Sequence, residues 1–261
     1  MLIGRQPNGG LLEFFPMRMV DPYTLRMRQP REVLIFSASQ IKGEQETQED
    51  YFLNFNDECF ALADGVGSMP NGEYAAKFAS ETAIWAYKHI RQHRFYWLDK
   101  KLFMKRIFRT TNMMIWQKRR ENEFQEGLAT TLMVAMVGSK NYWLGTAGDS
   151  TAWLVHSGAI QKLTKEENPF DPHAKKLLGM KRLGLIPDFV SGQFNEDDVL
   201  VLATDGCANY TTPQDLLSSV SLTGTTVEDM NNAVTTLLKS AATNGSKENM
   251  TAIMIKRIAL R

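Results

Sequence analysis

Two strand-like apolar runs that each lead into Asp-Gly constrain this chain more than any other feature. The run 59–63 ends in Asp64-Gly65, and the run 199–203 is followed, after one threonine, by Asp205-Gly206. An aspartate at the end of a buried strand, beside glycine backbone that folds tightly, is suited to bind a metal ion. A single turn of this kind is common where strands end. Two of them predict that two carboxylates converge on one site.

The glycines after Asp64 do not build a nucleotide-binding loop. The spacing Gly65-x-Gly67 would open a dinucleotide fingerprint, but Pro70 stands at the third glycine position. The segment 67–72 has the spacing of a phosphate-binding loop, but Glu73 and Tyr74 stand where Lys and Ser or Thr are required. A glutamate at the position of the lysine would repel phosphate. The dinucleotide fingerprint therefore fails at Pro70, and the phosphate-binding loop fails at Glu73.

Length and composition indicate a globular protein that acts neither on nucleic acid nor at a membrane. The 261 residues are 43% hydrophobic and 23% charged, which suits one large or two small domains. A net charge of +1 gives no bulk attraction for nucleic acid or acidic lipid. No apolar run approaches the roughly 20 residues of a membrane span, and no signal-peptide pattern is present. With Cys59 and Cys207 predicted to be buried thiols rather than a disulfide, we expect a soluble cytoplasmic protein.

The order of the predicted elements favours a two-layer β core covered by helices. Residues 1–32, which are broken by prolines and rich in arginine, are predicted to form an N-terminal extension, and 164–198 an irregular flap or lid. Because short strands follow one another directly, most pairing should be antiparallel, in a single α+β domain over 33–261. Strands are predicted over 33–37, 51–55, 58–63, 130–137, 142–147, 151–156, 159–163, 199–203 and 250–255, and helices over 73–93, 98–121, 213–220 and from a cap at Thr226.

Acidic residues recur at the ends of these strands. They are Glu49-Asp50, Asp64, Asp149, Asp205 and Glu248. Oxygen ligands without a His or Cys cluster favour Mg²⁺ or Mn²⁺ over zinc, and carboxylates that face one space repel each other unless cations lie between them. Two ions roughly 4 Å apart can share a hydroxide and drive in-line displacement at phosphorus. The alternative is that these acids only cap turns.

The chain resembles the metal-dependent type 2C serine/threonine protein phosphatases in their bacterial form. The matching blocks follow the family order over nearly the whole chain after residue 33, and eight blocks in order are a specific signal. They are Gln48-Glu-Asp50, Leu62-Ala-Asp-Gly-Val-Gly67 with Gly72-Glu73, 127–131, Ala147-Gly-Asp-Ser150, Gln161-Lys-Leu-Thr164, Leu178-Gly179, Ala203-Thr-Asp-Gly206, and Gly245-Ser-Lys-Glu-Asn-Met-Thr251.

The resemblance implies two stacked antiparallel sheets flanked by pairs of antiparallel helices. It implies that Asp64 bridges two Mn²⁺ or Mg²⁺ ions with the Gly65 carbonyl on one of them, and that Asp205 and Glu248 hold the first ion. By the same resemblance Glu49 binds the second ion, Asp50 orients metal-bound water, and Asp149 faces a third, looser metal site. Asp64, Asp205 and Asp50 are the implied catalytic residues, and a bridging hydroxide attacks phosphoserine or phosphothreonine. The implied partners are phosphorylated proteins and a cognate kinase.

Two departures from the family pattern bear on activity. Glu248 stands where the family usually has Asp, and Gln45 stands where it usually has a phosphate-gripping Arg. Because Gln offers no charged fork to phosphate, the metals would hold it, helped by a cation such as Lys42. These departures keep a rival function open: a weakly active or inactive relative that acts as a phosphoprotein- or kinase-binding adaptor. A third option is a phosphatase specialised for a non-protein phosphoester.

Overall fold

The computed structural model describes residues 31–67, 69–93, 98–124, 127–165 and 176–260, and it has two five-stranded sheets. The pairs β2–β3, β3–β4, β4–β5, β5–β8, β6–β7, β6–β9 and β9–β10 are antiparallel. One sheet has the order β1 (Arg31–Ile41), β10 (Met250–Leu260), β9 (Val199–Ala203), β6 (Thr151–His156), β7 (Ala159–Lys162). The other has the order β2 (Asp50–Phe55), β3 (Cys59–Asp64), β4 (Leu132–Val137), β5 (Asn141–Ala147), β8 (Asp188–Gln193).

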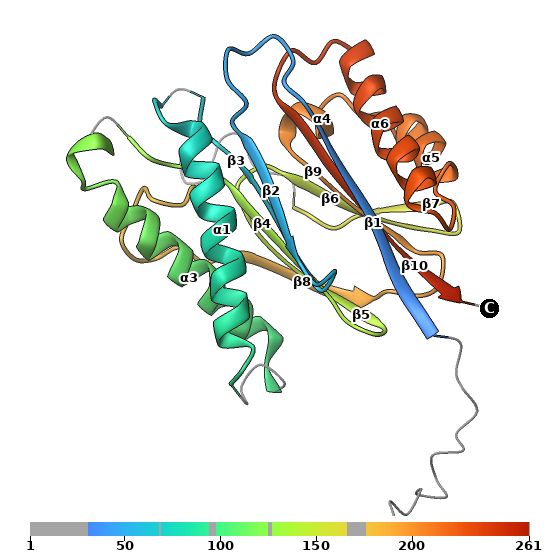
Figure 1. Ribbon diagram of the computed structural model, residues 1–261, viewed down its shortest axis with the longest axis horizontal. Coiled ribbons are helices and arrows are strands. Elements are labelled where there is room, and N and C mark those ends of the chain that lie inside the picture. The colour runs from blue at the N-terminus through green and yellow to red at the C-terminus, as the bar shows by residue number, and fades with distance from the viewer. Residues whose placement is uncertain (1–30, 68, 94–97, 125–126, 166–175, 261) are drawn as a thin grey trace, which may run out of the picture. The chain divides into compact units, whose positions relative to one another are not determined.

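Within Glu32–Ala259 the two sheets stack face to face, and a helix pair covers each outer face (Figure 1). Helices α1 (Gly72–Ile90) and α3 (Lys100–Lys118) pack on the β2–β8 sheet, and α5 (Pro213–Ser221) and α6 (Val227–Thr243) on the other. Two short helical turns complete the elements: η2 (Asn122–Phe124) and α4 (Asp205–Ala208). The predicted class, two antiparallel sheets flanked by helix pairs, is therefore confirmed.

The central strands are buried on both faces, which explains their continuous apolar sequences. In β9, Val201 packs toward α6 while Leu200 and Leu202 pack between the sheets. In β3, Ala61 faces α1 and α3 while Phe60 faces the other sheet. This alternation follows from the two-residue period of a strand. Because a slip of one residue would exchange the two faces of β3, the packing also fixes the position of Asp64 at the strand's end.

Local signals set several boundaries where the sequence predicts them. Thr226 caps α6 in a capping box with Asp229, and Thr212 caps α5 in the same way with Asp215. The turn between β2 and β3 has Asn56 and Asp57 at φ 50 and 54, the left-handed conformation that these residues tolerate well.

Three features differ from the sequence expectations. The segment 164–198, predicted to be irregular, contains β8, whose apolar signal is weak because it is a partly exposed edge strand. Residues 166–175 of that segment, like the extension at 1–30, lie outside the described residues. Asp205 and Gly206, predicted to form a turn, begin the helix α4 instead. Strands β1 and β10 extend beyond their predicted ends.

The predicted state of the cysteines is confirmed, because Cys59 and Cys207 are both buried free thiols. Among the residues that the structure describes, no helix has the length and apolar character needed to cross a membrane.

Candidate metal centre

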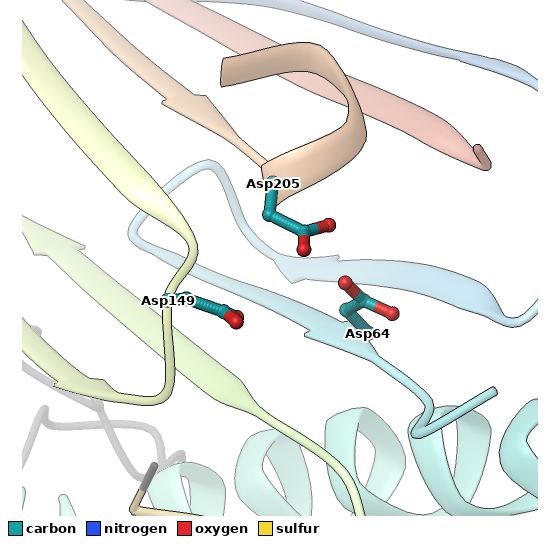
Figure 2. Close-up of side chains that lie close together, drawn as sticks. All are labelled: Asp64, Asp149 and Asp205. Atoms are coloured by element: carbon teal, nitrogen blue, oxygen red, sulfur yellow. The ribbon is translucent and has the colours of Figure 1, made fainter. Parts of the chain in front are cut away.

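Three aspartates from distant parts of the sequence meet at one end of the sandwich. Asp64 ends β3, Asp149 lies between β5 and β6, and Asp205 begins α4 directly after β9 and Thr204. Each presents a carboxylate oxygen, and these atoms all lie within 4.8 Å of one another (Figure 2). The convergence predicted from the two Asp-Gly sequences is thus present, with Asp149 as the third member.

Glycines allow the backbones around these carboxylates to approach closely. A Cβ atom on Gly65 would lie 2.3 Å from the carbonyl oxygen of Gly72, and one on Gly206 would lie 2.2 Å from the carbonyl oxygen of Asn249. No side chain fits at either position without moving backbone. The glycines after Asp64 and Asp205 are therefore needed for close packing of neighbouring segments.

A cavity of about 280 Å³ opens over the three aspartates. Its lining is dominated by oxygen-bearing groups. The lining residues include the predicted site residues Gln45, Glu49, Asp64, Gly65, Asp149, Asp205 and Glu248, together with Val66, Gly67, Thr131, Leu177 and Asn249. We call this cavity the metal cleft.

Asp50 lies beneath the cleft and is almost completely buried, with 2% of its surface exposed. Its Oδ2 atom accepts hydrogen bonds from the hydroxyls of Thr204 at 2.8 Å and Thr251 at 2.7 Å. Its Oδ1 atom is buried without a hydrogen-bond partner among the described residues. Burial raises the pKa of Asp50 to about 6, although the Thr251 and Thr204 hydrogen bonds act in the opposite direction. A buried acceptor without a donor fits an ordered water or a cation's hydration shell.

The pKa of the Asp64 carboxyl group is strongly perturbed. Burial, followed by the charges of Asp50 and Asp205, raises the pKa of Asp64 to about 10. The charged form is therefore unfavourable at neutral pH unless a cation compensates it. Oxygen-only donors, several carboxylates in one space and an unsatisfied buried oxygen together fit Mg²⁺ or Mn²⁺.

Glu49 and Glu248 line the same cleft but lie outside the group of three close carboxylates. The Glu49 carboxylate rests against Gly72, where a Cβ atom would lie 2.7 Å from it. Burial raises the pKa of Glu49, and Thr47, whose hydroxyl donates to Oε1 at 3.3 Å, partly offsets this effect. The Glu49 carboxylate is thus held at the wall of the cleft, where it could bind a second cation.

Asn249, directly before β10, holds the loop before Glu49 by hydrogen bonds. Its Oδ1 atom accepts from the Glu49 backbone N–H at 2.7 Å, and its Nδ2 atom donates to the carbonyls of Lys42 at 2.7 Å and Thr47 at 3.1 Å. Sequence reasoning did not single out Asn249, Thr204 or Thr251. All three stand inside the recognised sequence blocks, but their partners lie about 150 to 210 residues away along the chain.

The two predicted phosphate-region residues are placed differently. Gln45 is exposed and lines the metal cleft. Lys42 is not among the lining residues, and its ammonium group donates to the Glu46 carbonyl at 3.2 Å.

The sequence profile of protein phosphatase 2C matches residues 38–254, which is most of the chain. The chain belongs to the protein phosphatase 2C family. This phosphatase is 25% identical over 253 residues to a Mycoplasma pneumoniae protein provisionally named a protein phosphatase, covering 85% of this chain and 95% of that protein. It is 21% identical over 250 residues to the serine/threonine phosphatase stp of Listeria welshimeri, covering 84% and 92% respectively.

The fold of this phosphatase is shared with solved structures. The catalytic domain of the serine/threonine protein phosphatase PstP, crystallised in complex with two manganese ions, matches with a TM-score of 0.71 and 19% identity, over 87% of this chain and 99% of that one. A bacterial serine phosphatase matches with a TM-score of 0.71 and 22% identity, over 87% and 98%.

We expect Glu248→Asp to change metal affinity about tenfold and to favour Mg²⁺. The shorter side chain withdraws the carboxylate by one methylene, to the reach of the Asp that the family usually has at this position. Mg²⁺ should respond most, because it demands near-ideal ligand geometry. Isothermal titration with Mg²⁺ and Mn²⁺ measures the effect. Glu44→Asp is the matched control, since Glu44 is exposed, pairs with Lys247 at 3.1 Å and lies outside the cleft. Identical affinities of Glu248→Asp and wild type for both ions would remove Glu248 from the ligand set.

Proposed function

We propose that this chain is a Mn²⁺- or Mg²⁺-dependent phosphatase that hydrolyses phosphoserine and phosphothreonine in proteins, using the metal cleft as its active site. The observation that carries the proposal is the meeting of Asp64, Asp149 and Asp205 within 4.8 Å. Membership of the protein phosphatase 2C family supports the reaction class. The adaptor alternative has no observation of its own, since each predicted carboxylate lines or underlies the cleft.

The proposed ligands divide between two cation positions and a third, looser one. Asp64 would serve both main ions, with the Gly65 carbonyl as a further oxygen donor. Asp205 and Glu248 would hold the first ion, Glu49 the second, and Asp149 would face the third. When bound, the cations supply Lewis acidity that activates water and neutralises charge on the phosphoryl oxygens.

Asp50 has the proposed role of acceptor for the proton of the attacking water. Its Oδ2 atom is held by two hydroxyls, whereas its buried Oδ1 atom has no hydrogen-bond partner among the described residues and could accept the proton. The amide of Gln40 donates both to the Asp50 carbonyl and to the Thr251 hydroxyl, at 3.1 Å each, which fixes this arrangement further. Gln45 lines the cleft and is the better placed of the two candidates for the phosphate region, ahead of Lys42.

The proposed partners follow from the proposed reaction. A protein phosphatase acts on the products of a protein kinase, so a cognate serine/threonine kinase would supply its substrates. We place the protein in the cytoplasm, where a reducing environment suits two buried free thiols.

Hydrolysis of a small aryl phosphate with Mn²⁺, with and without EDTA, tests the proposal. We expect turnover that requires Mn²⁺ and that EDTA abolishes. The carboxylates alone provide no Lewis acid to activate water or to neutralise charge on the phosphoryl oxygens. A panel of phosphoserine and phosphothreonine peptides then tests the substrate class. Rates on the aryl phosphate that do not respond to metal removal would refute the proposed mechanism, and activity on the aryl phosphate alone would favour a non-protein phosphoester.

A further inference from the structure

A groove beside the metal cleft is formed by residues 102–112 of α3 and the segment 176–188. Two cavities of about 660 and 590 Å³ meet along it, and both are lined by Asn112 and by 184–186. We call them together the flap groove. Leu177 lines both the flap groove and the metal cleft, so the two hollows are neighbours that share this residue.

Several of the residues that line the flap groove are apolar and exposed. Met180, Leu183 and Ile186 have 42%, 61% and 62% of their surface accessible, and Leu185 and Pro187 also line the hollow. Single exposed apolar side chains are common on protein surfaces, but a contiguous group in a concave site marks a place where another molecule binds.

Positively charged side chains also line the flap groove. Lys105, Arg109 and Arg182 line one of its two cavities, and Lys181 lines the other. Among the described residues, the acid that lines the groove is Asp188, which is already paired with Lys176 at 2.5 Å and Lys165 at 3.3 Å. A lining that combines apolar and basic side chains is complementary to a chain segment that carries both acidic and apolar side chains.

The groove is fixed in shape by buried contacts with α3. The Asn112 side chain donates to the Lys181 carbonyl at 2.9 Å and the Arg182 carbonyl at 3.3 Å, and it accepts from the Gly179 N–H at 2.9 Å. The Arg182 guanidinium lies 5.5 Å above the Trp116 ring. A preformed groove loses little conformational entropy when it binds a ligand.

The same segment is tied to the metal centre. The Leu178 N–H donates to the Thr130 carbonyl at 2.9 Å, and the Thr130 hydroxyl donates to the Asp64 carbonyl at 2.7 Å. The wall of the groove therefore holds a set position relative to Asp64.

We propose that the flap groove binds the acidic and apolar residues that flank the phosphorylated residue of a protein substrate. The inference rests on the proposed function and adds a substrate class to it. A small phosphoester in the metal cleft would leave the groove empty, whereas a peptide that leaves the cleft past Leu177 would enter it. The protein's own N-terminal segment is a poor occupant, because residues 1–30 contain four arginines and two acidic residues.

The test compares phosphothreonine peptides that differ only in their flanks: acidic with Leu or Ile, basic with Leu or Ile, or acidic with Ser and Gly. We expect the first to have the lowest KM. The variant Lys105→Glu/Arg109→Glu should raise that KM about five- to thirtyfold, since two exposed attractions become repulsions. The kcat should change little, because flank contacts are the same in the bound substrate and the transition state. Ile186→Asn should raise KM for both peptides with apolar flanks.

The controls separate the groove from the metal centre. Turnover of the aryl phosphate should be unchanged in all groove variants, and Lys239→Glu, an exposed charge reversal on α6, should leave every KM unchanged. Fluorescence anisotropy with labelled, unphosphorylated flank peptides measures binding without turnover, so it decides the inference even if the enzyme were inactive.

Several outcomes would overturn the inference. Equal KM and equal peptide affinity for all flanks would do so while leaving the proposed function intact. Sedimentation showing a dimer that Ile186→Asn dissociates would assign the groove to a second copy of the chain instead. Metal-independent or absent hydrolysis with selective peptide binding would refute the proposed function alone.

Discussion

Asp64→Asn is expected to lower Mn²⁺-dependent turnover by at least about a hundredfold, because it removes the carboxylate that the other acids surround. The neutral amide keeps the size of the side chain but attracts cations less strongly. Turnover of an aryl phosphate at saturating Mn²⁺ measures the loss, and titration calorimetry shows whether metal affinity falls with it. Near-normal Mn²⁺-dependent rates would exclude Asp64 from the metal site.

The same substitution should stabilise the metal-free protein. The folded pKa of Asp64 lies near 10, mainly because of burial, whereas an unfolded Asp titrates near 3.9. Between these values the folded chain binds the proton more tightly, so wild-type stability falls as pH rises from about 4 toward 10. Asn carries no such charge. We therefore expect the free energy of unfolding of metal-free Asp64→Asn to exceed that of wild type by about 1–3 kcal/mol at neutral pH. Each kcal/mol should raise the Tm by about 2–4 °C.

Thermal unfolding in EDTA across pH 5–9 measures this gain. The Tm of wild type should fall with pH more steeply than that of Asp64→Asn, and the two curves should converge at low pH. Asp188→Asn is the matched control with the opposite sign, because Asp188 forms ion pairs with Lys176 and Lys165 that the amide would lose. If the Tm of wild type and of Asp64→Asn fell equally with pH, folding would not raise the pKa of Asp64.

The parts of this fold that could be predicted are those set by local sequence. The runs 59–63 and 199–203 are apolar throughout because both faces of β3 and β9 are buried, so their existence and their terminal aspartates could be predicted without tertiary knowledge. The capping box at Thr226 is equally local. Edge strand β8 was missed because its outer residues face solvent and lack an apolar signal.

The environment of each site residue could not be predicted, because distant segments create it. Asp50 is a sequence neighbour of Glu49, but its carboxylate is held in place by hydrogen bonds from Thr204 and Thr251, 154 and 201 residues further along the chain. The flap groove likewise combines α3 with the segment 176–188, and only the structure shows that Asn112 joins them. Spacing within a motif thus predicts which residues carry the chemistry, while long-range hydrogen bonds decide how they are held.

Gly206→Ala is expected to disrupt both stability and activity, although it adds a single methyl group beside the site. That methyl would lie 2.2 Å from the Asn249 carbonyl oxygen and 2.9 Å from the Glu248 Cβ atom. Both neighbours belong to a segment that is held in place, since Asn249 bonds to Lys42, Thr47 and Glu49. The backbone after β9 must therefore move away from the segment before β10.

The expected destabilisation is about 3 kcal/mol, at the upper end for overpacking because the collision is with backbone. Tm should fall by about 6–12 °C. Turnover should fall at least about a hundredfold, since Asp205 and Glu248 stand on the two segments that separate and a shift near 1 Å at an active site has that effect.

Gly158→Ala is the control, because Gly158 has a φ of +80 but no atom within 4 Å of an added Cβ. It should lose about 1 kcal/mol through backbone strain alone and keep full turnover. Thermal unfolding in EDTA and aryl phosphate kinetics on both variants separate collision from strain. If Gly206→Ala matched Gly158→Ala in both measurements, the close approach of residue 206 to Asn249 would not govern the metal centre, and the position of Glu248 beside Asp205 would have another cause.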